Sequence, residues 1–484
     1  MHTVRVDVAV VGSGTAGLNA RRQAERQGRR VVMIESGPYG TLCARVGCMP
    51  SKLLIAAAEA AHGVDEAGRF GVRVPDGVRV DGPAVLERVR RERDRFVGFV
   101  VRDTLAIPEA QRLRGRARFV APGVLEVEPE APGGEPVRVE ARAVVLATGS
   151  TPVLPPPYDA IREHVMVSDD VFELEDLPRS LAVAGTGIVG LELGQALARL
   201  GVDVAFFNPD REVGPFRDPE LQRVAREVLG EELVLHLGAD VHEAQPVPGG
   251  VRLRWRSADG DDRDAVFERV LVAAGRRPAL EDLDLAKAGA PPGEGGVPPW
   301  DPRTTQVADL PLFLAGDASG HRPLLHEASD EGRIAGANAA AFPDVETRER
   351  RTKLVVAFTD PQIGLVGASW DALDPGEVEV GEVSYADQGR ARVAGANRGL
   401  VRLYARRRGC QLVGAEMLGP RVEHMAHLLA WAVQEGMTVQ HALRMPFYHP
   451  VFEEGLRTAL RELASKLEVT GECRCEDLAD APGS

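Results

Sequence analysis

The glycine-rich segment GSGTAG, which begins at Gly12, constrains the fold of this chain more than any other feature. It follows an apolar run, Val4–Val11, that predicts a buried strand, and it precedes a helical stretch. In such a unit Gly12 allows a tight turn, Gly14 lets the backbone approach a pyrophosphate, and Gly17 lets the helix pack on the strand. The next predicted strand closes with Glu35, whose carboxylate can accept both hydroxyls of an adenosine ribose. The segment therefore predicts a dinucleotide site, and the alternative is a glycine-rich turn in a plain α/β fold.

The same pattern occurs a second time further along the chain. Leu181–Ala184 predicts a strand, and the glycines of the following turn are Gly185, Gly187 and Gly190. Two fingerprints predict two dinucleotide sites, and hence two cofactors or a cofactor and a cosubstrate. The second site lacks the acid that closes the first, because Asn208 stands at that position. These residues leave NAD and NADP both open.

Composition and charge limit the classes of partner. A chain of 484 residues with 44% hydrophobic and 27% charged residues predicts about three globular domains. The formal net charge of -14 argues against nucleic acid and anionic membranes, since both attract clustered Lys and Arg. We find no run that could span a bilayer and no signal-peptide pattern at the N-terminus. We therefore expect a cytoplasmic enzyme.

Two of the five cysteines, Cys43 and Cys48, lie close together before an apolar, alanine-rich segment. We interpret them as a redox-active disulfide at the start of a helix, whose free N–H groups and dipole would help to stabilise a thiolate. They could also be small buried hydrophobes or half of a zinc site. Zinc needs four ligands, and the other close pair, Cys473 and Cys475, lies at the far end of the chain. We expect no metal site.

A glycine-rich strand–helix unit followed by CxxxxC-x-P-S-K resembles the pyridine nucleotide–disulfide oxidoreductases. These are FAD-containing homodimers, and the GCMPSK variant in this chain is most similar to their dihydrolipoamide dehydrogenase branch. The resemblance implies that Cys43 exchanges with substrate and that Cys48 contacts the flavin. It also implies that dihydrolipoamide is oxidised by NAD⁺ and that NAD is favoured over NADP.

The resemblance also implies roles for residues outside the fingerprints. Lys52 would lie near the flavin ring and pair with Glu192. The loop with Thr148 and Gly149 would lie beside FAD, and Asp317 would bind the ribityl chain. Asn208 and Gly275 would lie at the NAD(P) site.

Near the C-terminus, His449 and Glu454 match the His-Pro…Glu motif of the family. Dithiol–disulfide exchange requires a base to make a thiolate and an acid to protonate the leaving sulfur, and histidine does both near neutral pH. A carboxylate on the other ring nitrogen orients the imidazole. In relatives this pair belongs to the other subunit, so the resemblance implies a homodimer with shared active sites.

The resemblance suggests the following domain organisation. We expect an FAD-binding domain in two segments, 1–151 and 276–345, around an NAD(P)-binding domain at 152–275. A dimerisation domain would cover 346–470, and 471–484 would form a cysteine-containing tail. The expected fold is thus α/β, with two Rossmann-like domains and a C-terminal α/β dimerisation domain.

The tail leaves other functions open. Cys473 and Cys475 resemble the C-terminal cysteine pairs of mercuric reductases and large thioredoxin reductases. The redox residues of those relatives are adjacent, whereas in this chain an arginine separates them. Reduction of thioredoxin, mercuric ion or a low-molecular-weight disulfide is therefore an alternative, and incidental thiols are the simpler explanation. A nucleotide-binding scaffold without disulfide turnover is the alternative from another class. The expected partner is a lipoyl domain, another lipoylated protein, or a small dithiol or disulfide.

Overall fold

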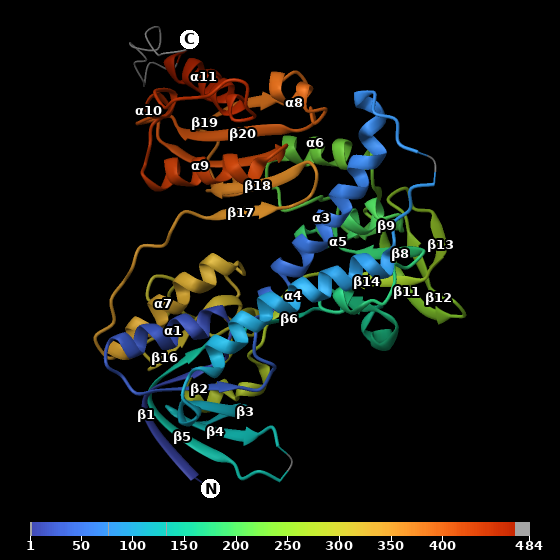
Figure 1. The fold of residues 1–484 in the computed structure, drawn as a ribbon. Helices are drawn as coiled ribbons and strands as arrows, with labels where there is room; N and C mark the ends of the chain where they lie inside the picture. The colour runs from blue at the N-terminus through green and yellow to red at the C-terminus, as the bar shows by residue number, and fades with distance from the viewer. Residues whose placement is uncertain (1, 76, 132, 470–484) are drawn as a thin grey trace.

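The structure is a computed structural model that describes residues 2–75, 77–131 and 133–469. The chain forms three α/β units (Figure 1), of which the first contains a 6-stranded sheet. The strands of this sheet are β1 (His2–Val11), β2 (Val31–Glu35), β3 (Arg112–Ala121), β4 (Val124–Pro129), β5 (Val137–Leu146) and β16 (Leu312–Leu314). The helices of this unit are α1 (Thr15–Arg26), α2 (Leu42–Val46), α3 (Cys48–Asp65), α4 (Gly82–Leu105) and α7 (Leu325–Ala341).

In the first sheet β1 lies between β2 and β5 and pairs parallel with both. On the outer sides, β3 pairs parallel with β2, and β16 pairs parallel with β5. The strand β4 is antiparallel to β3 and β5, so these three strands form a meander. Because β16 follows the second unit in the sequence, the first unit is built from two chain segments.

The second unit contains a parallel sheet in the order β10-β9-β8-β14-β7. These strands are β7 (Met166–Val167), β8 (Ser180–Ala184), β9 (Asp203–Asn208), β10 (Val234–Leu237) and β14 (Arg269–Val272), with helices α5 (Ile188–Arg199) and α6 (Pro219–Gly230). A second, antiparallel sheet consists of β11 (Asp240–Val247), β12 (Gly250–Arg256) and β13 (Asp262–Phe267). Residues 152–178 are rich in proline at their start, a composition that predicts a linker. That prediction is wrong in part, since β7 adds an edge strand to the sheet.

A short two-stranded ribbon carries both chain crossings between these two units. It consists of β6 (Ser150–Pro152) and β15 (Arg276–Pro278), which are antiparallel, with Arg276 opposite Pro152. The chain leaves the first unit through β6 and returns to it through β15.

The third unit is an antiparallel sheet in the order β17-β18-β21-β20-β19. Its strands are β17 (Leu354–Ala357), β18 (Gln362–Gly367), β19 (Val378–Ser384), β20 (Leu400–Arg406) and β21 (Leu412–Gly419). Its helices are α8 (Gly389–Val393), α9 (Val422–Gln434), α10 (Val439–Leu443) and α11 (Glu454–Val469). This agrees with the predicted C-terminal α/β domain.

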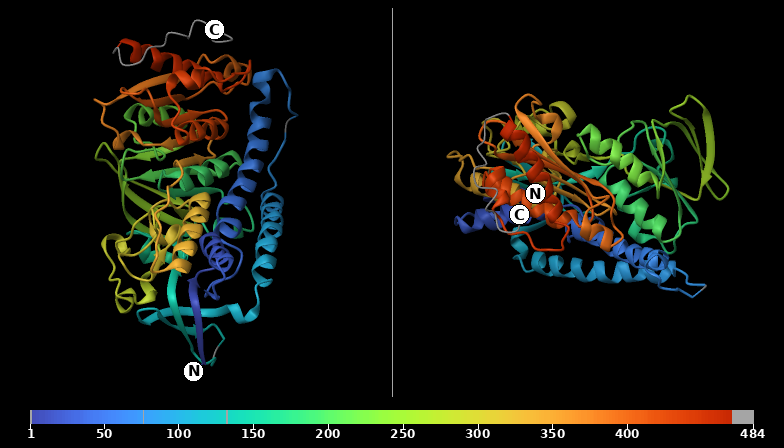
Figure 2. Two further views of the ribbon diagram at one scale, coloured as in Figure 1. Left: turned by 90° about the vertical axis from the view of Figure 1, so that its left-hand side faces the viewer. Right: turned by 90° about the horizontal axis from the view of Figure 1, so that it is seen from above.

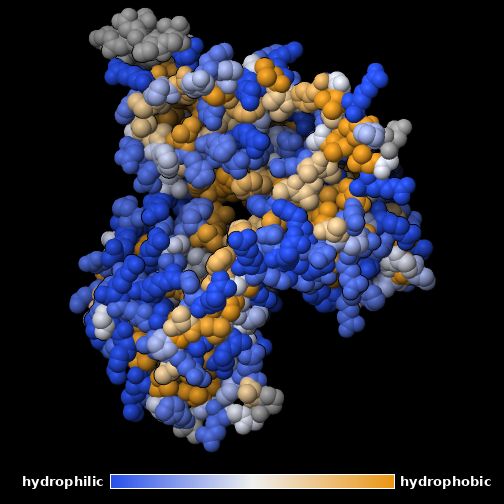
Figure 3. All heavy atoms as spheres, viewed as in Figure 1, coloured by the Kyte–Doolittle hydropathy of each residue, from blue (hydrophilic) through white to orange (hydrophobic). Residues whose placement is uncertain are grey.

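The three units share apolar cores. Leu54 of α3, Leu191 of α5 and Val355 of β17 belong to one buried cluster, so the cysteine-bearing helix packs against both other units. Figure 2 shows α3 and α4 along one edge of the molecule, reaching from the first unit toward the third. The face drawn in Figure 3 is mostly hydrophilic, and apolar residues come to the surface in the hollow between the units. Within the described residues, no helix is long and apolar enough to cross a membrane.

Candidate active site

The first glycine cradle has the close approaches that the sequence predicted. Gly12 has φ +106°, and a Cβ there would lie 2.2 Å from the carbonyl oxygen of Ala147. A Cβ on Gly17 would lie 1.9 Å from the carbonyl oxygen of Gly12, whereas nothing lies within 4 Å of a Cβ on Gly14. The cradle is therefore tightly packed at Gly12 and Gly17 and open at Gly14, and it borders a cavity of about 710 Å³. An extended dinucleotide such as FAD fits this arrangement.

Glu35 and the loop after β5 border the same cavity. The Glu35 carboxylate accepts hydrogen bonds from the backbone N–H and the hydroxyl of Ser13, at 2.7 and 2.8 Å. The hydroxyl of Thr148 is buried and has no hydrogen-bond partner among the described residues, and Gly149 next to it has φ +75°. A buried hydroxyl without a partner is unfavourable, and a cofactor bound here would satisfy it.

Asp317 follows β16. It does not line the cavity itself, but it binds a residue that does. Its Oδ2 accepts a hydrogen bond of 2.7 Å from the hydroxyl of Ser150, which lines the cavity. The backbone N–H of the preceding residue, Gly316, donates to the Glu331 carboxylate at 2.8 Å. The loop that carries Asp317 is thus held from two sides.

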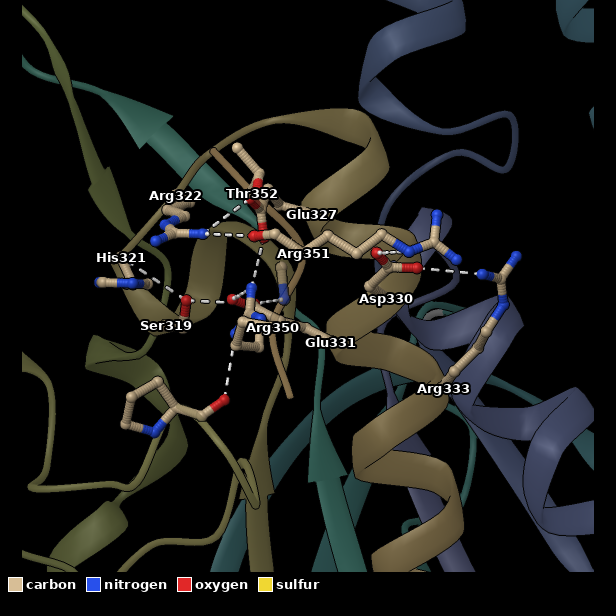
Figure 4. Close-up of polar contacts among 12 residues, drawn as sticks. Ser319, His321, Arg322, Glu327, Asp330, Glu331, Arg333, Arg350, Arg351 and Thr352 are labelled. Atoms are coloured by element: carbon tan, nitrogen blue, oxygen red, sulfur yellow. Dashed lines mark hydrogen bonds and ion pairs between the residues drawn. The ribbon is translucent and has the colours of Figure 1, made fainter. Parts of the chain in front are cut away.

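Behind this loop lies a buried cluster of opposite charges (Figure 4). Glu327 and Glu331 are one turn apart on α7, and their side chains are 2% and 0% exposed. Arg350 donates to both carboxylates, with 2.9 Å between its Nη2 and Oε1 of Glu331. Arg322 donates to Glu327 at 3.0 Å. The segment that leads into the third unit is thereby bound to the loop of Asp317.

The second cradle repeats the geometry of the first. Gly185 has φ +114°, and a Cβ on Gly190 would lie 2.2 Å from the Gly185 carbonyl oxygen. Gly187 has nothing within 4 Å of a Cβ position. These residues border a cavity of about 640 Å³, which Asn208 and Gly275 also line. An NAD(P) molecule fits this cradle in the same way as FAD fits the first.

Asn208 is held by its own amide group. Its Nδ2 donates to the hydroxyl of Thr186 at 2.8 Å and to the carbonyl oxygen of Glu212 at 3.0 Å. The charged residues that line the second cavity are Asp210, Glu212, Asp240 and Arg276. Arg211, a cation near the end of β9, is not among the lining residues, and its side chain lies beside Gly238.

Cys43 lies in α2, and Cys48 is the first residue of α3; both are free thiols. Gly47 separates the two helices, and a Cβ there would lie 3.1 Å from the Cα of Cys43. The Cys43 thiol donates a hydrogen bond to Cys48, and for that reason first the pKa of Cys48 is lowered to about 7. The nearby charge of Lys52 also lowers it, whereas burial opposes it. The same hydrogen bond, and then burial, raise the pKa of Cys43.

Lys52 and Glu192 form an ion pair next to these thiols. The Lys52 Nζ lies 3.0 and 2.8 Å from the two carboxylate oxygens of Glu192, whose side chain is 6% exposed. Phe358, just after β17, donates its backbone N–H to Glu192 at 2.8 Å, and its ring lies 4.7 Å from Nζ of Lys52. The pair therefore joins all three units. Sequence reasoning missed Phe358, because nothing in its local pattern indicates this contact.

His449 and Glu454 also lie together, on the third unit. The Nδ1 of His449 is 2.9 Å from Oε1 of Glu454, and the imidazole is 81% exposed. Within the described residues, neither member of this pair has a hydrogen bond or ion pair with Cys43 or Cys48. The chain thus presents the imidazole to solvent. The predicted auxiliary cysteines, Cys473 and Cys475, lie outside the described residues.

Comparison with known proteins identifies the family and the fold. Residues 6–332 match the pyridine nucleotide-disulphide oxidoreductase family, and residues 354–460 match the dimerisation domain of that family. The chain belongs to this family. It is an oxidoreductase, and the family implies FAD and NAD(P) as cofactors. The dimerisation domain supports a homodimer.

Two relatives carry the name dihydrolipoyl dehydrogenase. The Bacillus subtilis enzyme is 30% identical, with 94% of this chain and 97% of the relative covered. The Halobacterium salinarum enzyme is also 30% identical, with 94% and 95% covered. Among solved structures, LpdA from Mycobacterium tuberculosis has a TM-score of 0.80 at 24% identity and covers 95% of this chain and 100% of its own. The flavoprotein disulfide reductase RclA from Escherichia coli has a TM-score of 0.79 at 21% identity, with 96% and 99% covered. These two structures share the fold.

Proposed function

We propose that this protein oxidises dihydrolipoamide to lipoamide with NAD⁺, using Cys43 and Cys48 as a redox disulfide. The observation that carries the proposal is the hydrogen-bonded thiol pair at the start of α3, in which the pKa of Cys48 is lowered to about 7. A structural pair of buried cysteines has no need of such a thiolate. The dihydrolipoyl dehydrogenases that are 30% identical over 94% of the chain support the choice of substrate.

The two cysteines differ in a way that suits different tasks. In the oxidised enzyme a substrate thiolate would attack Sγ of Cys43 and break the Cys43–Cys48 bond, so that Cys48 leaves as a thiolate. The lowered pKa of Cys48 makes it the better leaving group. The second substrate thiol would then attack the substrate sulfur of the mixed disulfide, releasing lipoamide and the Cys43 thiol. Bound FAD would supply the electron acceptor between the dithiol and NAD⁺.

We propose that His449 of the partner subunit transfers the protons in this reaction. Glu454 holds Nδ1, which leaves Nε2 free to take the proton from a substrate thiol. The carboxylate also stabilises the imidazolium that forms. Burial acts to raise the pKa of Glu454, but the hydrogen bonds with His449 and with the Val451 N–H outweigh it and lower the pKa. The exposure of His449 on the third unit supports a site completed by a second chain.

We also propose NAD as the nicotinamide cofactor. Of the four charged residues that line the second cavity, three are carboxylates, and the exception is Arg276 near the ribbon. The 2′-phosphate of NADP would bring additional negative charge close to them, which like-charge repulsion disfavours. NAD⁺ should therefore show the higher kcat/KM when the two cofactors are compared.

The test is anaerobic addition of dihydrolipoamide to the purified holoenzyme while the flavin spectrum is recorded. A long-wavelength thiolate-to-flavin band, followed by NADH formation when NAD⁺ is added, is the expected result. Cys48→Ser should abolish the band but keep the flavin, which provides the matched control. If dihydrolipoamide has no effect while NADH raises the band, the redox pair stands and the substrate is wrong. If neither reductant raises the band, the assignment of the cysteines is wrong.

A further inference from the structure

Arg276 lies where the first and second units join. It begins β15, which with β6 forms the ribbon that contains both chain crossings between the units. Its side chain is 21% exposed, so most of the guanidinium is enclosed by protein. The next residue, Arg277, has a side chain that is 51% exposed and pairs with Glu281. Only the first of these two adjacent arginines is thus built into the junction.

On one side, Arg276 binds Ser150, which lines the first cavity. Its Nε donates to the hydroxyl of Ser150 and its Nη2 to the Ser150 carbonyl oxygen, both at 2.9 Å. The Ser150 hydroxyl in turn donates a hydrogen bond to Oδ2 of Asp317 at 2.7 Å. The guanidinium therefore fixes the orientation of Ser150, and through Ser150 that of Asp317.

On the other side, Arg276 reaches the second cavity. It lines that cavity together with Ser168, to whose hydroxyl Nη1 donates at 3.3 Å. The same Nη1 donates to Oδ1 of Asp169 at 3.1 Å, and Asp169 lines the first cavity. One guanidinium thus contacts a residue from the wall of each cavity.

Charge makes this position unusual. Among the described residues that line the second cavity, Arg276 is the one cation, and the other charged residues are Asp210, Glu212 and Asp240. A bound dinucleotide carries an anionic pyrophosphate, and guanidinium is the side chain best suited to it. Such a nucleotide would compete with Asp169 for Nη1. Asp169 would then lose its counter-charge beside the first cavity, where the pyrophosphate of FAD is also anionic.

We propose that Arg276 is a positioning residue that couples the two cofactor sites, so that NAD⁺ bound in the second cavity weakens FAD in the first. The proposal rests on the assignment of FAD and NAD to these cavities. Linkage requires the effect to be reciprocal, so bound FAD weakens NAD⁺ by the same factor. Binding effects of this kind commonly amount to about five-fold or more.

The test is the dissociation constant of FAD from the oxidised holoenzyme, with and without saturating NAD⁺, followed by the fluorescence of released flavin. Oxidised enzyme and NAD⁺ do not react, so the ratio of the two constants reports binding alone. We expect about a five-fold ratio in the unmodified protein. Arg276→Met and Asp169→Asn should each bring the ratio close to 1, because the first removes the shared guanidinium and the second removes the charge that competes for it. Arg277→Met should retain the ratio, even where it changes both constants.

A merely structural role for Arg276 would change FAD binding equally in both conditions and leave the ratio intact. That result, or a ratio of 1 in the unmodified protein, overturns the coupling. Asp169→Asn keeps the test decisive if Arg276→Met does not fold. Failure of the protein to bind FAD or NAD⁺ at all would instead refute the proposed function.

Discussion

The charge cluster behind the Asp317 loop predicts a large effect for a single substitution far from the thiols. Arg350→Met removes the guanidinium that binds Glu327 and Glu331. Glu327 keeps Arg322, but Glu331, which is 0% exposed, would retain only the Gly316 N–H and the Ser319 hydroxyl. Removing one side of a buried ion pair costs about 3–5 kcal/mol, because the remaining charge has no compensation. A cooperative unit of about 150–250 residues loses about 2–4 °C in melting temperature per kcal/mol, so the melting temperature should fall by on the order of 10 °C.

The effect should depend on pH with a definite sign. Burial already raises the pKa of Glu331 despite Arg350, and without Arg350 burial acts alone. A carboxyl whose folded pKa lies above its unfolded value contributes stability at low pH that is lost as the pH rises through the folded pKa. The stability deficit of Arg350→Met should therefore be smaller near pH 5 than near pH 8.

The assay is thermal unfolding of the holoenzyme, followed by flavin fluorescence, across this pH range. Arg333→Met is the matched control, because Arg333 pairs with Asp330 on the same helix at 3.0 Å but is 51% exposed. Exposed pairs contribute at most about 1 kcal/mol, so this control should barely change the melting temperature. Adding Glu331→Gln to Arg350→Met should recover part of the loss. Equal melting temperatures for the two arginine variants would refute the reasoning.

Three further predictions concern the site and one buried ion pair outside it. His449→Gln should lower dihydrolipoamide turnover by about 10²–10⁴-fold, measured by steady-state NADH formation, while the flavin spectrum stays unchanged. Lys52→Met should move the alkylation midpoint of Cys48 in the reduced enzyme upward from about pH 7, since it removes a cation that lowers the pKa of this thiol; an unchanged midpoint in an iodoacetamide pH series would contradict this. Asp218→Asn should destabilise the protein to denaturant by about 3 kcal/mol, because Asp218 is 0% exposed and Arg402 would lose its buried partner.

The elements that the sequence predicted well are those whose signal is local. The apolar run before Gly12 became β1, and the run before Gly185 became β8. The pattern of apolar residues and the conformational freedom of glycine are local properties of the sequence, so they can be recognised without knowing which distant segments pack against them. The predicted linker at 152–178 failed at β7, a strand of two residues that exists only because β14 offers it an open edge.

The candidate site divides along the same line. The sequence by itself determined the kinds of chemistry available: two glycine cradles, a CxxxxC pair and a His-Pro…Glu motif, each set by residues a few positions apart. Only the tertiary structure decided which charges meet. Phe358 reaches Glu192 across 166 residues, and Ser150 reaches Asp317 across 167. Arg350 was not identifiable from its neighbours, because a buried charge becomes necessary only where folding brings opposite charges out of water together.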